Sequence, residues 1–383
     1  MFNPITFARR IPMSVVGAVL GFGMAAALAQ TFQAPAAPSQ SQAYSQDSSQ
    51  NQSQAQDWAQ REAQRAAETV AAASVAGVSV RDAEWQDSAR KRTVPVRVYL
   101  PREAQTGGPS PKLPLVVFSH GLGGSRLGYS QFGRHFAENG MVALHVQHAG
   151  SDRAVWQGGP FALIGNLQGA ASEANALARA EDVSFAITTI LADPQIGPLI
   201  DATAIAVAGH SYGANTAMLL AGAAVERNGK RVSLSDARVK AAILLSAPPF
   251  HGEGDQAAVL RDVRIPTLHV TGTDDKIRVP GYRSDAVDRI GVFRNMPTAA
   301  SGLKHLAIFE GGEHSVFTDR TRSDKALAIK AATRDLSLAF LRTALRNQSG
   351  AVEKVLEQIR PLLTSPEQLL ARRFDAQVRP ATQ

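Results

Sequence analysis

The chain has 383 residues, which is enough for one large domain with flanking segments. It contains no cysteine, and this excludes a disulfide framework, a thiolate nucleophile and a cysteine-ligated metal. The net charge of +7 comes from scattered basic residues rather than a basic and aromatic patch, so the sequence does not favour nucleic-acid binding.

Residues 1–29 have the pattern of a secretory signal peptide. Arg9 and Arg10 supply positive charge, and an apolar run follows them over residues 11–27. It ends at Ala27-Leu28-Ala29, a small-residue cleavage site. An uncleaved anchor is the alternative, because the run is close to the length that spans a bilayer. We expect cleavage after Ala29 and a periplasmic or secreted mature protein with no stable membrane span.

Residues 30–77 are expected to connect this leader to the folded domain. The stretch from Thr31 to Gln56 is rich in Gln, Ser and Ala and has little to bury, which predicts a disordered linker. The composition of residues 57–74 favours a surface helix. The folded domain is expected over residues 78–346, and a peripheral helical extension, broken at Pro361 and Pro366, over residues 347–383.

Short apolar runs alternate with helical patterns between residues 78 and 346. Strands are expected at 94–100, 113–119, 141–146, 203–208, 239–245, 267–270 and 306–309, and helices at 129–139, 172–191, 214–226 and 325–345. This alternation predicts an α/β fold with a mostly parallel, eight-stranded type of sheet and helices on both faces. We expect no cofactor and no metal, because the chain has no phosphate loop, dinucleotide fingerprint or metal-ligand cluster.

The strongest chemical signal is a strand–turn–helix junction at residues 205–220. Its pentapeptide, Gly209-His210-Ser211-Tyr212-Gly213, has the G-x-S-x-G pattern, in which a strand turns directly into a helix and exposes the central hydroxyl. The glycines let the two backbone arms approach, and the helix N-terminus favours negative charge beside the serine. We expect Ser211 to be a nucleophile. An ordinary serine in a glycine-rich turn is the alternative.

A serine hydroxyl needs a base that accepts its proton during attack. Of the nine histidines, His314 lies in a glycine-flanked loop after the last expected strand, where the catalytic groups of open α/β sheets gather. A carboxylate that orients the imidazole is expected after the preceding strand, where Asp274 and Asp275 are adjacent. The Gly-x-x-Asp spacing favours Asp275, and Asp274 stays open as the alternative.

The order Ser211, Asp275, His314 is that of the triad in the α/β-hydrolase fold. The backbone N–H groups of Tyr212, directly after the nucleophile, and of Leu122, in the glycine-rich loop after the 113–119 strand, are the expected oxyanion donors. Further residues that follow strand ends are candidates for a substrate pocket, with core packing as the alternative: His148, Trp156, Phe250 and Phe317.

Four stretches together resemble the bacterial platelet-activating-factor-acetylhydrolase-like α/β hydrolases, which are often labelled predicted dienelactone hydrolases. They are Phe118 to Ser125, Arg179 to Phe185, Gly209 to Asn215 and Gly312 to Ser315. The resemblance covers about residues 78–345 and implies a carboxylic ester hydrolase with a serine triad. True dienelactone hydrolases use a cysteine nucleophile, which this chain lacks, so their lactone substrate is not implied.

We therefore expect an exported serine esterase that acts on a small-molecule or lipid ester, with short-chain or acetyl esters as the first candidates. An amidase or peptidase with the same triad is one alternative, because a triad alone does not choose the leaving group. A non-catalytic protein of the same fold that binds a ligand in the cleft is another. Fold alone does not decide between them.

Overall fold

The computed structural model describes residues 60, 63–64, 67–71, 77–102, 111–279 and 281–378; the side chains of residues 159–161 and 373–378 are outside this description. The predicted signal peptide, residues 1–29, and the Thr31–Gln56 linker also lie outside it. Of the predicted surface helix, residues 60, 63–64 and 67–71 are described, and they are helical.

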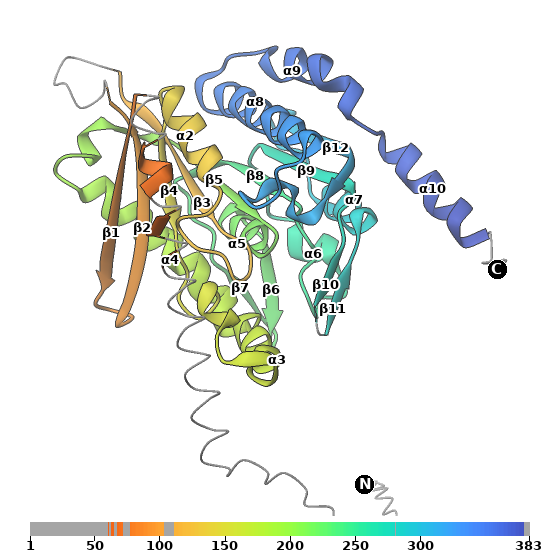
Figure 1. Ribbon diagram of the computed structural model, residues 1–383, viewed down its shortest axis with the longest axis horizontal. Coiled ribbons are helices and arrows are strands. Elements are labelled where there is room, and N and C mark those ends of the chain that lie inside the picture. The colour runs from red at the N-terminus through yellow and green to blue at the C-terminus, as the bar shows by residue number, and fades with distance from the viewer. Residues whose placement is uncertain are drawn as a thin grey trace, which may run out of the picture. The chain divides into compact units, whose positions relative to one another are not determined.

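Eight strands form one sheet in the order β1-β2-β4-β3-β5-β8-β9-β12 (Figure 1). β2 pairs antiparallel with both β1 and β4, and all other neighbours are parallel. The mostly parallel, eight-stranded sheet expected from the sequence is confirmed. The strands are β1 (Val78–Asp87), β2 (Arg92–Pro101), β3 (Leu113–Ser119), β4 (Val142–Val146), β5 (Ile200–His210), β8 (Val239–Leu245), β9 (Thr267–Asp274) and β12 (Lys304–Glu313).

The central strands are mostly apolar because both faces of the sheet are covered. In β3, Leu115 and Val117 pack into one core, whereas Val116 and Phe118 pack into the other. The first core includes side chains of α4 (Glu173–Ala192), α5 (Tyr212–Ala221) and α7 (Ala286–Asn295). The second includes side chains of α2 (Ser130–Glu138), α8 (Asp324–Arg346) and α9 (Ala351–Ile359).

Local capping explains where the long helices begin. The Ser172 side chain accepts a hydrogen bond from Asn175 N at the start of α4, and Ser323 accepts one from Ala326 N at the start of α8. The helices expected at 172–191 and 325–345 are thereby confirmed. The helix expected at 214–226 is too long, because α5 stops at Gly222, whose φ of 123° suits only glycine.

Residues 224–226 instead belong to a small hairpin, β6 (Ala224–Arg227) and β7 (Lys230–Ser233). A second hairpin follows β9 and consists of β10 (Ile277–Val279) and β11 (Tyr282–Ser284). Three helices were also not predicted from the sequence: α3 (Gly159–Ala170), α6 (Gln256–Leu260) and α7.

The C-terminal extension contains α9 and α10 (Pro366–Val378), which begins at the predicted break. Between them, Leu363 forms an antiparallel bridge with Phe309, and Thr364 N donates to Ile308 O. These contacts occupy backbone groups of β12, the last strand of the sheet, and so protect an edge that would otherwise be free to pair with another chain. None of the helices among the described residues is both long enough and apolar enough to cross a bilayer.

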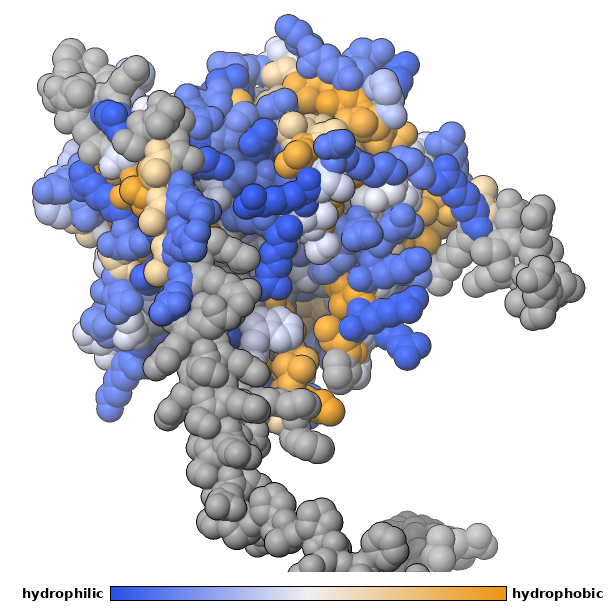
Figure 2. Space-filling model, in the orientation of Figure 1, coloured by the Kyte–Doolittle hydropathy of each residue, from blue (hydrophilic) through white to orange (hydrophobic). Residues whose placement is uncertain are grey.

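The face in Figure 2 is mostly hydrophilic, with separate hydrophobic areas between charged side chains. Among the described residues, Trp156 and Ile164 are two of the most exposed large apolar side chains, at 48% and 50%. Both belong to the segment formed by the 3-10 turn Arg153–Trp156 and α3, which borders the cavity described next.

Candidate active site

Ser211 stands at the sharp turn between β5 and α5, as the G-x-S-x-G pattern predicts. Its φ of 55° and ψ of −121° are strained for a residue with a side chain. A Cβ atom on Gly209 would lie 2.1 Å from Gly213 O, and one on Gly213 would lie 1.9 Å from Ser119 O. Glycine is required at both positions because backbone atoms are already in contact there.

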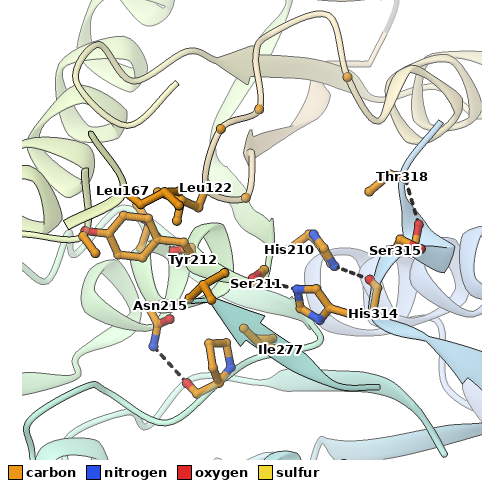
Figure 3. Close-up of a pocket in the computed structure, with 18 of the residues that line it drawn as sticks. Leu122, Leu167, His210, Ser211, Tyr212, Asn215, Ile277, His314, Ser315 and Thr318 are labelled. Carbon is orange, nitrogen blue, oxygen red and sulfur yellow. Dashed lines mark hydrogen bonds between the residues drawn. The ribbon is translucent and has the colours of Figure 1, made fainter. Parts of the chain in front are cut away.

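His314 bridges Ser211 and Asp275. Its Nε2 lies 2.9 Å from Ser211 Oγ (Figure 3). Its Nδ1 lies 2.7 Å from Asp275 Oδ1. Asp275 is fully buried, whereas its neighbour Asp274 is exposed at the end of β9. Of the two aspartates that the sequence left open, Asp275 is therefore the one that contacts the imidazole.

The Asp275 carboxylate has further partners from β9 and α7. Thr271 Oγ1 donates to Oδ2 at 2.7 Å, and Arg289 Nη2 lies 3.4 Å from Oδ1, the same oxygen that His314 contacts. Burial would raise the pKa of Asp275, but the His314 hydrogen bond and the Arg289 guanidinium outweigh it and hold the pKa well below its ordinary value. The carboxylate is thus ionised at neutral pH. No motif in the sequence indicated Arg289.

His210, next to Ser211, contacts the backbone of His314 rather than the Ser211 hydroxyl. Burial and the neighbouring His314 lower the pKa of His210 to about 3, so the ring is neutral. Its Nδ1 lies 2.9 Å from the Tyr129 hydroxyl and its Nε2 lies 2.9 Å from His314 O. With Tyr129 as donor to Nδ1, the Nε2–H donates to the His314 carbonyl and fixes the backbone of the loop.

The loop at residues 120–124 faces the nucleophile turn. Gly121 N donates to the Tyr129 hydroxyl, Gly123 N to Ser151 O, and Gly124 N to Gly121 O. Among the described residues, no hydrogen bond is recorded for the N–H of Leu122. The N–H of Tyr212, the first residue of α5, has no acceptor within its own helix. These two N–H groups therefore stay available to an oxyanion.

A cavity of about 1360 Å³ opens beside Ser211 and His314. Trp156 and Phe250 line it, as expected, together with Leu122, Leu167, Leu219 and Ile277. His148 and Phe317 do not line it, contrary to the expectation. His148 is buried in a polar network, and Phe317 packs in the core with α8. Within the described part of the chain, no group of three or more acidic or histidine side chains could hold a metal ion.

Two family models match separate parts of the chain. Residues 90–157 match "Platelet-activating factor acetylhydrolase, isoform II", and residues 199–289 match "Serine hydrolase (FSH1)". A curated relative, the platelet-activating factor acetylhydrolase of Cavia porcellus, is 28% identical over 134 residues, which are 27% of this chain and 31% of that protein. This chain therefore aligns with less than a third of the relative's length.

Two separate segments of the chain thus resemble serine hydrolases, and the first of them resembles the platelet-activating factor acetylhydrolases. Two solved structures resemble the chain, and the one with a TM-score above 0.5 shares its fold. An acylaminoacyl peptidase is 16% identical with a TM-score of 0.52, and the matched region is 73% of this chain and 44% of the peptidase chain. A cold-adapted esterase from an Arctic intertidal metagenomic library is 20% identical with a TM-score of 0.46, and the matched region is 70% of this chain and 95% of the esterase chain. At these identities the likeness concerns the fold alone.

The expectations of an α/β-hydrolase fold and of this family resemblance are thereby confirmed. The roles of individual residues, the substrate and the export of the hydrolase are matters of proposal.

Proposed function

We propose that the chain is an exported serine carboxylic ester hydrolase that works through Ser211, His314 and Asp275. The observation that carries this proposal is the hydrogen-bonded chain from Ser211 through His314 to Asp275 at the wall of a large cavity. The signal-peptide pattern of residues 1–29 supports export.

In this mechanism Ser211 Oγ attacks the ester carbonyl carbon while His314 Nε2 accepts the hydroxyl proton. The carbonyl oxygen becomes an oxyanion, which accepts hydrogen bonds from the N–H groups of Leu122 and Tyr212. When the tetrahedral intermediate collapses, the C–O bond to the alcohol breaks and His314 returns its proton to the leaving oxygen. The acyl group stays on Ser211.

Water then enters, and His314 accepts one of its protons as the oxygen attacks the acyl-enzyme. The second tetrahedral intermediate collapses, the carboxylic acid leaves and Ser211 regains its proton. Throughout both halves Asp275 holds the imidazole with Nδ1–H toward its own Oδ1 and stabilises the imidazolium. The buried, ionised state of Asp275 supports this role.

We propose short-chain or acetyl esters as substrates. The cavity volume far exceeds that of an acetyl or butyryl group, so most of the cavity is left for the alcohol part of the ester. Its apolar lining, with Leu167, Leu219 and Phe250, favours an alcohol that is itself largely apolar.

A series of p-nitrophenyl esters from acetyl to decanoyl, together with the matching p-nitroanilides, tests this function. We expect kcat/KM to be highest for the acetyl or butyryl ester and turnover of the anilides to be negligible. Faster cleavage of the anilides would favour the amidase or peptidase alternative. Folded protein that binds these compounds but turns none of them over would contradict the proposal and favour a non-catalytic binding protein.

A further inference from the structure

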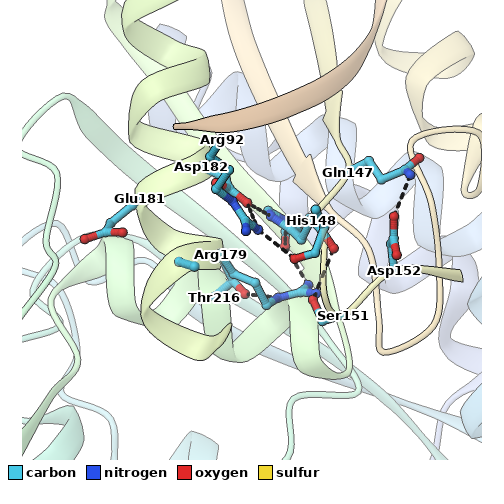
Figure 4. A network of polar contacts seen from close by, with 12 residues as sticks. Arg92, Gln147, His148, Ser151, Asp152, Arg179, Glu181, Asp182 and Thr216 are labelled. Carbon is cyan, nitrogen blue, oxygen red and sulfur yellow. Dashed lines mark hydrogen bonds and ion pairs between the residues drawn. The ribbon is translucent and has the colours of Figure 1, made fainter. Parts of the chain in front are cut away.

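A network of buried polar side chains lies beneath the loop at residues 120–124, and the mechanism proposed above does not use it (Figure 4). Its members come from four separate elements of the fold and are at most 2% exposed. They are Ser119 at the end of β3, His148 and Ser151 after β4, Arg179 and Asp182 in α4, and Thr216 in α5.

Arg179 is the centre of this network, because its guanidinium contacts three of these elements at once. Nε donates to Thr216 Oγ1 at 2.9 Å, and Nη1 donates to Ser151 Oγ at 2.8 Å. Nη2 donates to Ser119 Oγ at 3.0 Å and also to His120 O. The guanidinium carbon lies 4.5 Å from the centre of the Tyr212 ring, which it faces.

Arg179 carries its charge without a carboxylate beside it. The nearby Asp182 pairs instead with Arg90, Arg92 and His148. Among the described residues it forms no ion pair with Arg179. Burial lowers the pKa of Arg179 to about 10, which leaves it charged at neutral pH. A buried charge without a directly paired carboxylate is costly for stability, so its presence calls for another reason.

His148, the histidine of this network, is neutral and has both ring nitrogens in hydrogen bonds. Burial and the Arg179 guanidinium lower the pKa of His148 to about 4. Its Nδ1–H then donates to Asp182 Oδ2 at 3.1 Å, and its Nε2 accepts from the Ser119 hydroxyl at 2.9 Å. Ser119, His148 and Asp182 thus repeat the contacts of a Ser-His-Asp triad, but none of the three lines the cavity, so no ester reaches them.

We infer that Arg179 is a positioning residue that sets the two oxyanion donors against each other, and this inference rests on the function proposed above. Through Ser119 Oγ and His120 O it holds the start of the loop that carries Leu122. Through Thr216 and the Tyr212 ring it holds the first turn of α5, which carries the other donor. The planar Arg179 guanidinium therefore fixes the distance between the N–H groups of Leu122 and Tyr212.

The same guanidinium reaches the loop by a second route. Ser151 accepts a hydrogen bond from Arg179 through its side chain and another from Gly123 N through its carbonyl. The residue after Leu122 is thereby tied to the same centre. Lysine keeps the charge but has no planar guanidinium that reaches four acceptors in different directions, so it cannot replace this geometry.

The test compares Arg179→Lys and Arg179→Met with Arg97→Met in hydrolysis of p-nitrophenyl acetate. Arg97 is a matched control because it is an equally buried arginine, but it pairs with Asp82 in β1 and does not contact the oxyanion loop. We expect kcat to fall about 10- to 100-fold in both Arg179 variants, with KM within about threefold of the wild-type value. A displaced N–H donor loses part of the transition-state stabilisation that one oxyanion hydrogen bond provides. Arg97→Met should keep the wild-type kcat.

A pair of inhibitors separates this role from general destabilisation. A trifluoromethyl ketone forms a hemiketal with Ser211 whose oxyanion occupies the donor site, whereas the matching methyl ketone stays mostly a ketone. In the Arg179 variants we expect affinity for the trifluoromethyl ketone to fall in parallel with kcat and affinity for the methyl ketone to stay nearly constant. Equal losses for both ketones would contradict the inference.

If the Arg179 variants do not fold, as judged by circular dichroism, Ser151→Ala removes one of the four acceptors of the guanidinium with less disturbance. We then expect a drop in kcat of about 3- to 10-fold with the same selectivity between the two ketones. An unchanged kcat in this variant would overturn the inference. Wild-type protein that hydrolyses no ester would instead refute the proposed function itself, so the two failures are distinguishable.

Discussion

Replacing Ser211 by alanine is expected to lower kcat/KM for p-nitrophenyl acetate by about 10⁴- to 10⁶-fold. In the proposed mechanism this hydroxyl forms the acyl-enzyme, and no other described serine hydroxyl forms a hydrogen bond with the His314 imidazole. Alanine adopts the strained backbone at this turn as readily as serine does, so the fold should persist.

The measurement is initial-rate kinetics on both proteins, with circular dichroism to verify folding. Ser235→Ala is the control, because Ser235 is an exposed serine after β7, outside the site. It should have wild-type activity. A Ser211→Ala protein that hydrolyses the ester at the wild-type rate would show that the reaction takes place elsewhere.

The second large effect concerns the two adjacent aspartates. Asp275→Asn is expected to reduce kcat by about 10³- to 10⁴-fold, because an amide favours the wrong tautomer of His314 and does not stabilise the imidazolium. Asp274→Asn should change kcat by less than about twofold, since that side chain is exposed and only Asp275 contacts the imidazole.

Both variants remove one negative charge at neighbouring positions, so the comparison is well matched. Kinetics with p-nitrophenyl acetate should be accompanied by thermal unfolding, because Asp275→Asn also leaves the buried Arg289 without its carboxylate partner. A larger loss of kcat in Asp274→Asn, or equal losses in both, would contradict the assignment of Asp275.

Local patterns were sufficient to predict the nucleophile turn and the strands around it. Ser211 lies in five residues whose spacing encodes both the strand–helix turn and the glycines that the turn requires. β3 and β8 were predicted to the residue because they are predominantly apolar runs, which are interrupted in β8 by Lys240 alone. His314 could be predicted because the loop after the last strand lies at the same sheet edge as the nucleophile.

Other parts of the site depend on contacts between distant segments, which local patterns do not record. Arg289 reaches Asp275 from α7, a helix that the sequence analysis did not predict. Arg179 was noticed as part of a motif, but its contacts with β3 and α5 appear only after folding. His148 and Phe317 follow strand ends as pocket residues do, yet their loops turn those side chains into the interior.

Covalent labelling with a fluorophosphonate, followed by peptide mapping, tests the central claim most directly. Such a probe phosphonylates a serine only when a neighbouring base activates it. We predict one label per folded chain, on the peptide that contains Ser211, and no label in Ser211→Ala. A label on another serine, or no label on folded protein that still hydrolyses esters, would contradict the assignment of Ser211 as the nucleophile.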